Sequence, residues 1–242
     1  MSPAAQRART AREARVSLTR EQVVDAAIRL LEHDGYAGLS MRRVAQELGV
    51  GTMSLYWHVA DRDELLDLVF DRVVAMQVLD EVPADWRTAL DRIAHAALKL
   101  YEQNPWLLDL VPRPTVGAVV LQHVEQSIAA TVSMGLSFED RLTAVSALDD
   151  YVLGHVLRRH VYPDTDGPPE LSELAQQRLA AGDFPLYAEV AHDPSAHLAH
   201  ESARGFERGL SLILDGIAVA VDSGRMGHEP TVPVRHRGRR KT

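Results

Sequence analysis

Cysteine is absent from all 242 residues, which excludes disulfides, thiolate nucleophiles and thiolate metal sites. No apolar run approaches the roughly 18 residues that a membrane-spanning helix needs. The arginine-rich N-terminus lacks the apolar core of a secretion signal, and no stretch alternates apolar and polar residues as a half-buried strand does. These absences predict an all-α, cytoplasmic protein that makes no contact with a membrane.

Glycine-rich phosphate loops, a nucleophile motif and a clear His/carboxylate cluster are also missing, so we expect neither a cofactor nor an enzyme. The strongest argument for a metal site is the group of His192, His197 and His200. Their spacing matches no zinc-protease motif and no cysteine accompanies them, so we interpret them as part of a polar helix start and predict no metal. A helical metal-dependent or hydrolytic enzyme is the alternative from another functional class.

The formal net charge of −8 is distributed unevenly along the chain. Residues 1–20 contain five arginines and one glutamate, a net charge of +4. Residues 225–242 contain five arginines, one lysine and one glutamate, a net charge of +5, which leaves −17 for residues 21–224. A basic arm on an acidic body suits a protein that contacts nucleic acid at one end. The arm, residues 1–18, either follows phosphates or is simply solvated, and we interpret the tail, residues 224–242, as disordered.

The sequence between these ends divides into two helical parts, residues 19–80 and residues 84–223. Thr19 and Gln22 form a capping box, in which each side chain satisfies the other residue's backbone amide. Gly35 and Gly49 are typical of residues that end a helix. The predicted helices span about residues 20–34, 41–48, 52–58 and 61–79 in the first part and 85–103, 106–110, 115–134, 138–160 and 195–222 in the second, with short broken helices over 170–194.

Two of the short helices are joined at Leu48-Gly49-Val50-Gly51 with the spacing of a helix-turn-helix. In that motif the first helix braces the second, whose leading residues reach base edges in the major groove. Helix–glycine–helix turns also occur in helical bundles that bind no nucleic acid. The spacing alone therefore does not establish DNA binding, and the identities of the surrounding residues must be considered.

The residues around this turn resemble the DNA-binding domain of the TetR family of transcriptional repressors, from Thr19 to Leu68. Later segments resemble the C-terminal domain of the tetracycline-repressor branch of that family. The resemblance implies a homodimer that binds a palindromic operator in double-stranded DNA and is released by a small-molecule effector. The matching segments are Gly35-Tyr36-Ala37-Gly38-Leu39-Ser40, Val44-Ala45-Gln46-Glu47-Leu48-Gly49-Val50, Leu55-Tyr56-Trp57-His58-Val59, Asp63-Glu64-Leu65-Leu66, Gly135-Leu136-Ser137-Phe138-Glu139, Phe206-Glu207-Arg208-Gly209-Leu210 and Ile213-Leu214-Asp215-Gly216.

The resemblance assigns roles in operator binding position by position. Residues at the starts of the two short helices would face bases, and Arg42 among them could bond guanine bidentately. The residues that follow would lie against the DNA backbone, where contacts fix register without reading sequence. Thr52 and Ser54 could instead be merely exposed, and Trp57 could belong partly to the core. The predicted set is Arg42, Gly51, Thr52, Met53 and Ser54 at the bases and Tyr56, Trp57, His58 and Arg62 at the backbone.

Helical faces single out two polar residues of the second part as candidates for an effector pocket. Asp149 falls in an apolar row that runs through Phe138, Val145 and Val152, and His123 interrupts a similar row in the preceding helix. A buried polar group needs a partner, so each residue either lines a pocket or makes an internal hydrogen bond. Tyr101 and Trp106 are either pocket walls or core.

The resemblance adds Asp109 and Arg113 to the candidate pocket. Tetracycline repressors bind a drug–Mg²⁺ chelate through a histidine near an Arg-Pro pair. Here Arg113-Pro114 is present, but Asp109 stands at the histidine position and Arg158 at a later acidic position. Since an arginine there opposes a cation, we expect an effector other than a tetracycline–Mg²⁺ chelate.

The helices 138–160 and 195–222 are the expected dimer surfaces, because the resemblance implies that they pair into a four-helix interface. The apolar row of Phe206, Leu210, Ile213, Ile217 and Val221, with glycines beside it, would supply the second surface; ordinary core within one chain is the alternative. We expect the effector to shift the helix 61–79 and so move the two DNA-binding domains out of register. A DNA-binding dimer without an effector is a further alternative.

Overall fold

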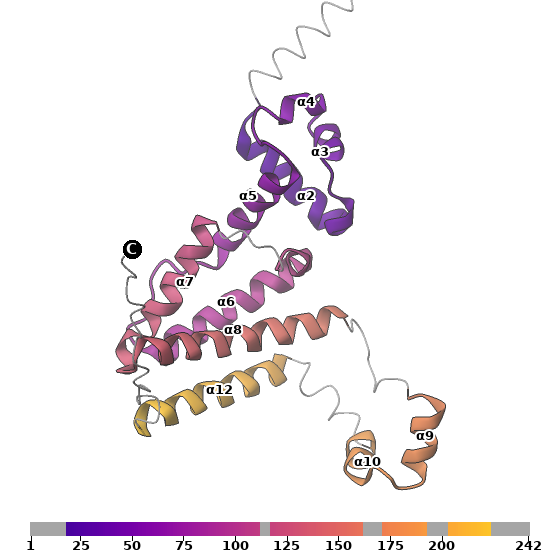
Figure 1. Ribbon diagram of the computed structural model, residues 1–242, viewed down its shortest axis with the longest axis vertical. Coiled ribbons are helices and arrows are strands. Elements are labelled where there is room, and N and C mark those ends of the chain that lie inside the picture. The colour runs from indigo at the N-terminus through magenta and orange to yellow at the C-terminus, as the bar shows by residue number, and fades with distance from the viewer. Residues whose placement is uncertain (1–17, 112–116, 162–170, 193–202, 224–242) are drawn as a thin grey trace, which may run out of the picture.

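The computed structural model describes residues 18–111, 117–161, 171–192 and 203–223, and these ranges form helices and no strand, which confirms the all-α fold. The helices are stacked along an elongated molecule (Figure 1). They are α2 (Arg20–Gly38), α3 (Met41–Glu47), α4 (Thr52–Leu55), α5 (Arg62–Val74), η1 (Ala75–Gln77), α6 (Trp86–Gln103), η2 (Pro105–Asp109), α7 (Ala118–Ala130), η3 (Val132–Met134), α8 (Phe138–Val161), α9 (Glu173–Ala180), α10 (Pro185–His192) and α12 (Ala203–Ser223).

Helices α2 to α5, which we call the head, begin with the capping box that the sequence predicts at Thr19. The Gln22 amide donates to Thr19 Oγ1 at 3.2 Å, and the Thr19 amide donates to Gln22 Oε1 at 2.9 Å. Ser40 caps α3 and Asp61 caps α5, each accepting a hydrogen bond from the backbone amide three residues on. Gly35 has a φ of 67°, so regular α2 stops there as predicted, before one more irregular turn.

The apolar interior of the head continues past its last helix. Leu31, Leu55 and Leu66 belong to a buried cluster that also takes in Trp106 and Leu107, from η2. Helix α2 packs directly against η2. Each fully buried side chain of this size stabilises the fold by about 1.5–3 kcal/mol, so part of the stability of the head comes from residues that follow α6 in the sequence.

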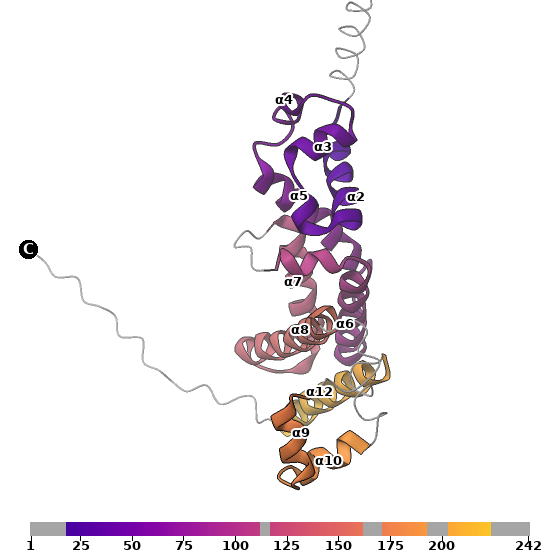
Figure 2. The ribbon, with the colours of Figure 1, turned by 90° about the vertical axis from the view of Figure 1, so that its right-hand side faces the viewer.

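Helices α6, α7, α8 and α12 form the body, which lies below the head in Figure 2. A second buried cluster joins α6, α8 and α12, and the fully buried Phe206 of α12 is part of it. The Phe206 ring stacks on Tyr151, with ring centroids 5.4 Å apart, and meets His155 edge-on at 5.0 Å. The Tyr151 hydroxyl donates to the Phe206 carbonyl oxygen at 2.8 Å. A side chain on Gly209 would collide with the Tyr151 ring, so glycine allows this close approach.

This packing corrects the expected dimer surface on the last helix. Phe206, Leu210 and Ile217 are buried within the subunit, and Ile213 and Val221 pack against the same cluster. The predicted apolar row is therefore core within one chain, because it faces α6 and α8. The outward face of α12 carries Leu212, Gly216 and Val219 instead.

The end of α5 differs from the predicted boundary. Regular α5 ends at Val74 rather than near Leu79, and beyond the short η1 the Gln126 side chain of α7 bonds both backbone groups of Leu79. Helix α9 buries no residue, and Leu174 and Leu186 of α9 and α10 are exposed.

The predicted arm, the tail and the start of the helix 195–222 lie outside the described residues. Among the helices described, none combines the length and the apolar character that crossing a membrane requires.

Truncation of Phe206 tests the cluster between α8 and α12. We expect Phe206→Ala to lower the free energy of unfolding by about 3–5 kcal/mol, because it leaves a cavity in a tightly packed site. The measurement is denaturant unfolding at fixed protein concentration. The matched control is Phe138→Ala, because Phe138 is 57% exposed and its removal should change the free energy by less than about 1 kcal/mol. Equal losses for both variants would contradict the assigned core.

Candidate nucleic-acid interface and ligand site

Helices α3 and α4 pack together around a tight turn. Gly49 has a φ of 66°, which residues with a Cβ rarely adopt. Its amide donates to the Gln46 carbonyl oxygen at 3.1 Å, and the Val50 amide donates to the Ala45 carbonyl oxygen at 3.0 Å. Leu55, the last residue of α4, is fully buried. The turn therefore holds α4 rigidly at the far end of the head, where Figures 1 and 2 show it.

Large side chains cover this end of the molecule without being buried in it. Trp57 is 85% exposed, Met53 is 71% exposed and Tyr56 is 44% exposed. Arg42, at the start of the α3 helix that packs against α4, is also exposed, and so is Gly51. Clustered apolar exposure of this kind marks a contact surface. Arg42 adds the positive charge that a nucleic acid requires.

Three residues of the predicted set have less access to solvent. Ser54 is only 5% exposed, so its hydroxyl does not face a duplex in this conformation. The prediction that Ser54 faces bases is therefore wrong. Helix α4 has only four residues, and Ser54 and Leu55 occupy its inward face. Thr52 and His58 are half-buried at the edges of the same surface.

Arg62 is used within the head, rather than free to meet a phosphate as the sequence predicts. Its guanidinium donates to the Tyr36 hydroxyl at 3.1 Å and to the carbonyl oxygens of Leu39 at 3.3 Å and of Tyr36 at 3.4 Å. It also lies over the Tyr36 ring, 4.6 Å from the centroid. Arg62 therefore ties the start of α5 to the loop between α2 and α3.

Sequence reasoning missed two further arginines that brace α3 and α4, which we call the reading helices. Arg20 donates to the His58 carbonyl oxygen at 2.7 Å and pairs with Glu64 at 2.6 Å, which fixes the turn after α4. Arg43 bonds the Gly38 carbonyl oxygen at 3.0 Å and pairs with Asp34. The Arg20 partners are 38 and 44 residues away in the sequence, so no local pattern could have identified them.

In the body, Tyr101 of α6 and Asp149 of α8 lie near one another. Burial raises the pKa of the Asp149 carboxyl to about 6, and the negative charge of Asp150 adds to this shift. Burial also raises the pKa of Tyr101, and the Asp149 charge contributes. Yet the Asp149 side chain reaches solvent. An accessible carboxylate surrounded by enough protein to resist ionisation is suited to contact a ligand.

The other predicted pocket residues differ in character. Trp106 is 5% exposed and belongs to the cluster shared with the head, and its indole N–H has no hydrogen-bond partner. His123 of α7 is half-buried, and burial lowers its pKa. Asp109 is exposed, and Arg113 lies outside the described residues. No group of three or more metal-ligating side chains occurs in the described ranges, and His197 and His200 fall outside them.

The head matches the family described as bacterial regulatory proteins, tetR family, over residues 23–69. The remainder matches the tetracyclin repressor-like C-terminal domain over residues 80–221. The chain belongs to the TetR family. This confirms the resemblance seen in the motifs around the helix-turn-helix.

TetR-family relatives span nearly the whole chain. The transcriptional repressor DrrR1 of Streptomyces coeruleorubidus is 35% identical over 233 residues, which cover 90% of this chain and 83% of DrrR1. Apo ActR from Streptomyces coelicolor superposes with a TM-score of 0.69 at 28% identity, covering 86% of this chain and 98% of ActR; ActR has also been solved with actinorhodin. Mycobacterium smegmatis BioQ, solved with its double-stranded DNA operator, superposes with a TM-score of 0.59 at 26% identity, covering 84% and 99%.

The raised pKa of Asp149 predicts a stability that depends on pH. Because the folded pKa of about 6 exceeds the ordinary 3.8, the wild-type carboxyl destabilises the fold fully above pH 6, and this destabilisation fades as the pH falls from 6 to 3.8. We expect Asp149→Asn to unfold at a higher denaturant concentration than wild type at pH 7.5, with roughly half of that advantage left at pH 5 because the unfolded carboxyl is still ionised there. Glu125→Gln, at an exposed carboxyl of α7, should show no such difference. A gain that persists unchanged at pH 5 would contradict the assignment.

Proposed function

We propose that the chain is a homodimeric transcriptional repressor that binds a near-palindromic operator through α3 and α4 and leaves it when a small-molecule effector binds the body. It acts as a regulator rather than an enzyme, in the cytoplasm where it meets its operator. The observation that carries this proposal is the exposed cluster of Arg42, Met53, Tyr56 and Trp57 on a braced helix-turn-helix. The operator complex of BioQ, a relative with the same fold, supports it.

The exposed residues divide by chemistry into two roles. Arg42 donates to base edges in the major groove, with Thr52 and Met53 beside it at the start of α4. Tyr56 and Trp57 lie along the sugar–phosphate backbone with His58, where the exposed backbone of Gly51 allows close approach. Ser54 and Arg62 hold the reading helices in place from within the head.

Dimerisation uses the faces of α8 and α12 that the subunit leaves uncovered. Leu157 and Val161 of α8 are 47% and 55% exposed, and Leu212 and Val219 of α12 are 73% and 62% exposed. Gly154 and Gly216 lie on the same faces, and a Cβ added at either would meet nothing within 4 Å. Apolar side chains interspersed with glycine let helices of two subunits approach closely, and two-fold pairing suits a palindromic operator.

The effector binds the body beside Asp149, Tyr101 and Trp106. Asp149 supplies a carboxylate that reaches solvent, and Trp106 supplies a donor that the protein leaves unsatisfied. The complex of ActR with actinorhodin supports a small-molecule effector in this family. His123 of α7 completes the proposed site, and Asp109 and Arg113 are assigned to it by resemblance alone.

The signal passes from the body to the head through contacts of α7 with α5. Gly117, at the start of α7, lies against the Asp71 carboxylate so closely that a Cβ would collide with it. Gln126 of α7 holds Leu79 after α5. A displacement of α7 therefore moves α5, and with it the reading helices of each subunit.

Selection from a random duplex library by the full-length protein tests operator binding. We expect a near-palindrome whose half-sites are about 10 base pairs apart. Arg42→Ala should weaken binding to the selected duplex by about tenfold to a hundredfold in fluorescence anisotropy, because a bidentate base contact is lost. The control is Arg92→Ala, which removes the same charge from an exposed position on α6 and should bind as wild type. Equal weakening in both variants would show that Arg42 acts only through net charge.

A charge on the outer face of α12 tests the dimer. We expect Leu212→Glu to convert the dimer to a folded monomer in light scattering, because pairing would bury an unpaired carboxylate. Ser211→Glu is the control on the same helix, since Ser211 is exposed but lies off the Leu212–Val219 face. A Leu212→Glu protein that stays dimeric at micromolar concentration would exclude this interface.

A further inference from the structure

A cavity of about 290 Å³ lies between the head and the body, apart from the proposed effector site. Its walls come from α2, α5 and η1 on the head side and from α7 on the body side. None of the residues assigned to the effector lines it. The volume is close to the lower end of the range of small-molecule sites, roughly 300–1,000 Å³.

The lining combines an apolar surface with an excess of negative charge. Val24 of α2, Leu68 of α5 and Val119 of α7 supply the apolar part from three helices. Three carboxylates and two guanidinium groups supply the rest, which gives the cavity a net charge of −1. An anionic occupant would therefore meet repulsion, and a cation with an apolar body would complement both parts of the lining.

Most of the charged side chains in this lining already form ion pairs or hydrogen bonds within the protein. Arg20 pairs with Glu64 at 2.6 Å and bonds the His58 carbonyl oxygen. Hydrogen bonding at the start of α2 lowers the pKa of Glu21, so that carboxylate is satisfied by its own helix. Arg72 and Asp25 form only a long ion pair of 3.9 Å.

Asp71 is the exception. Its Oδ1 is buried and has no hydrogen-bond partner, although the residue lines the cavity. A carboxylate that is only partly satisfied is costly to keep ionised, and a cation beside it in the cavity offsets that cost through its charge. Among the charged groups of the lining, Asp71 is therefore the one that lacks a donor for a buried oxygen.

We propose that this cavity binds a small organic cation, whose ammonium group donates to Asp71 and whose apolar body packs against Val24, Leu68 and Val119. The site is additional to the effector site beside Asp149. Its occupant touches α5 next to the contact between Asp71 and Gly117, so it lies where the two halves of the subunit meet.

Three indole compounds that share one body and differ in charge test the proposal. Isothermal titration of the full-length protein at pH 7.5, without DNA, compares tryptamine, tryptophol and indole-3-propionate. We expect tryptamine to bind at one site per subunit, tryptophol to bind at least about tenfold more weakly and indole-3-propionate not to bind, because only an ammonium group offers a charge-assisted hydrogen bond to Asp71. Failure of tryptamine to bind, or equal binding of all three, would overturn the proposal whether or not the protein binds an operator.

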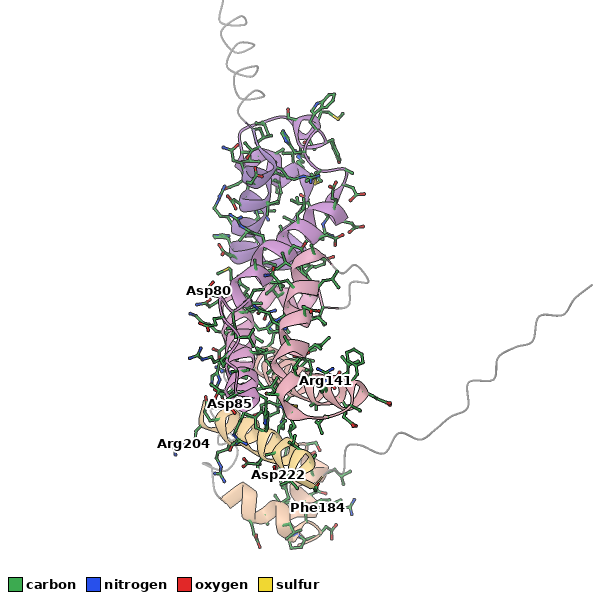
Figure 3. The ribbon with its side chains drawn as sticks, turned by 90° about the vertical axis from the view of Figure 1, so that its left-hand side faces the viewer. Asp80, Asp85, Arg141, Phe184, Arg204 and Asp222 are labelled. Atoms are coloured by element: carbon green, nitrogen blue, oxygen red, sulfur yellow. The ribbon has the colours of Figure 1, made fainter. Side chains whose placement is uncertain are left out.

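Variants locate the site. Asp71→Asn should weaken tryptamine binding by about tenfold or more, since it removes the charge and keeps the shape. Ala75→Leu keeps Asp71 and fills the cavity from an exposed position of η1, and it should abolish binding. Asp80→Asn is the matched control, because Asp80 is exposed on the outside of the body in Figure 3. Asp149→Asn should also bind normally, and loss of binding there with retention in Asp71→Asn would place tryptamine in the effector site and refute the assignment.

Discussion

The head depends on apolar packing that it shares with the segment beneath it. Two of its helices, α3 and α4, have only seven and four residues, and a core of this size gives little stability by itself. Trp106 and Leu107 of η2 complete the cluster formed by α2, α3, α4 and α5. The reading helices are consequently held by a core that the body helps to build, so the position of the head is tied to the position of the residues after α6.

Polar contacts then fix what the apolar cluster leaves free. Arg62 closes the loop between α2 and α3, and Arg20 closes the turn after α4. The Arg20–Glu64 ion pair is exposed enough for solvent to weaken it, so its effect is to orient the backbone more than to stabilise it. With these interactions made inside the head, Arg42, Met53 and Trp57 can point outward without partners of their own.

Local sequence was sufficient for the starts of three helices in the head and for the turn. Thr19, Ser40 and Asp61 cap helices where their side chains predict it, because a cap involves residues only three apart. The candidate site was less predictable. The burial of Ser54, the exposure of Trp57 and the internal bonds of Arg62 depend on which neighbours the fold brings in from far along the chain. The apolar row of α12 was recognised correctly as a buried face, but periodicity cannot say whether the partner is the same chain or another.

Gly117 has a consequence for how the protein could have been altered during its evolution. Even a methyl group at this position would overlap the Asp71 carboxylate, so any residue larger than glycine requires that side chain to turn away. Substitution of Gly117 would therefore break the contact between the start of α7 and the Asp71 side chain of α5 while leaving both helices in place. Such a chain would keep its fold and lose one of the links between its two halves, which makes a single backbone position a means of adjusting how tightly they are coupled.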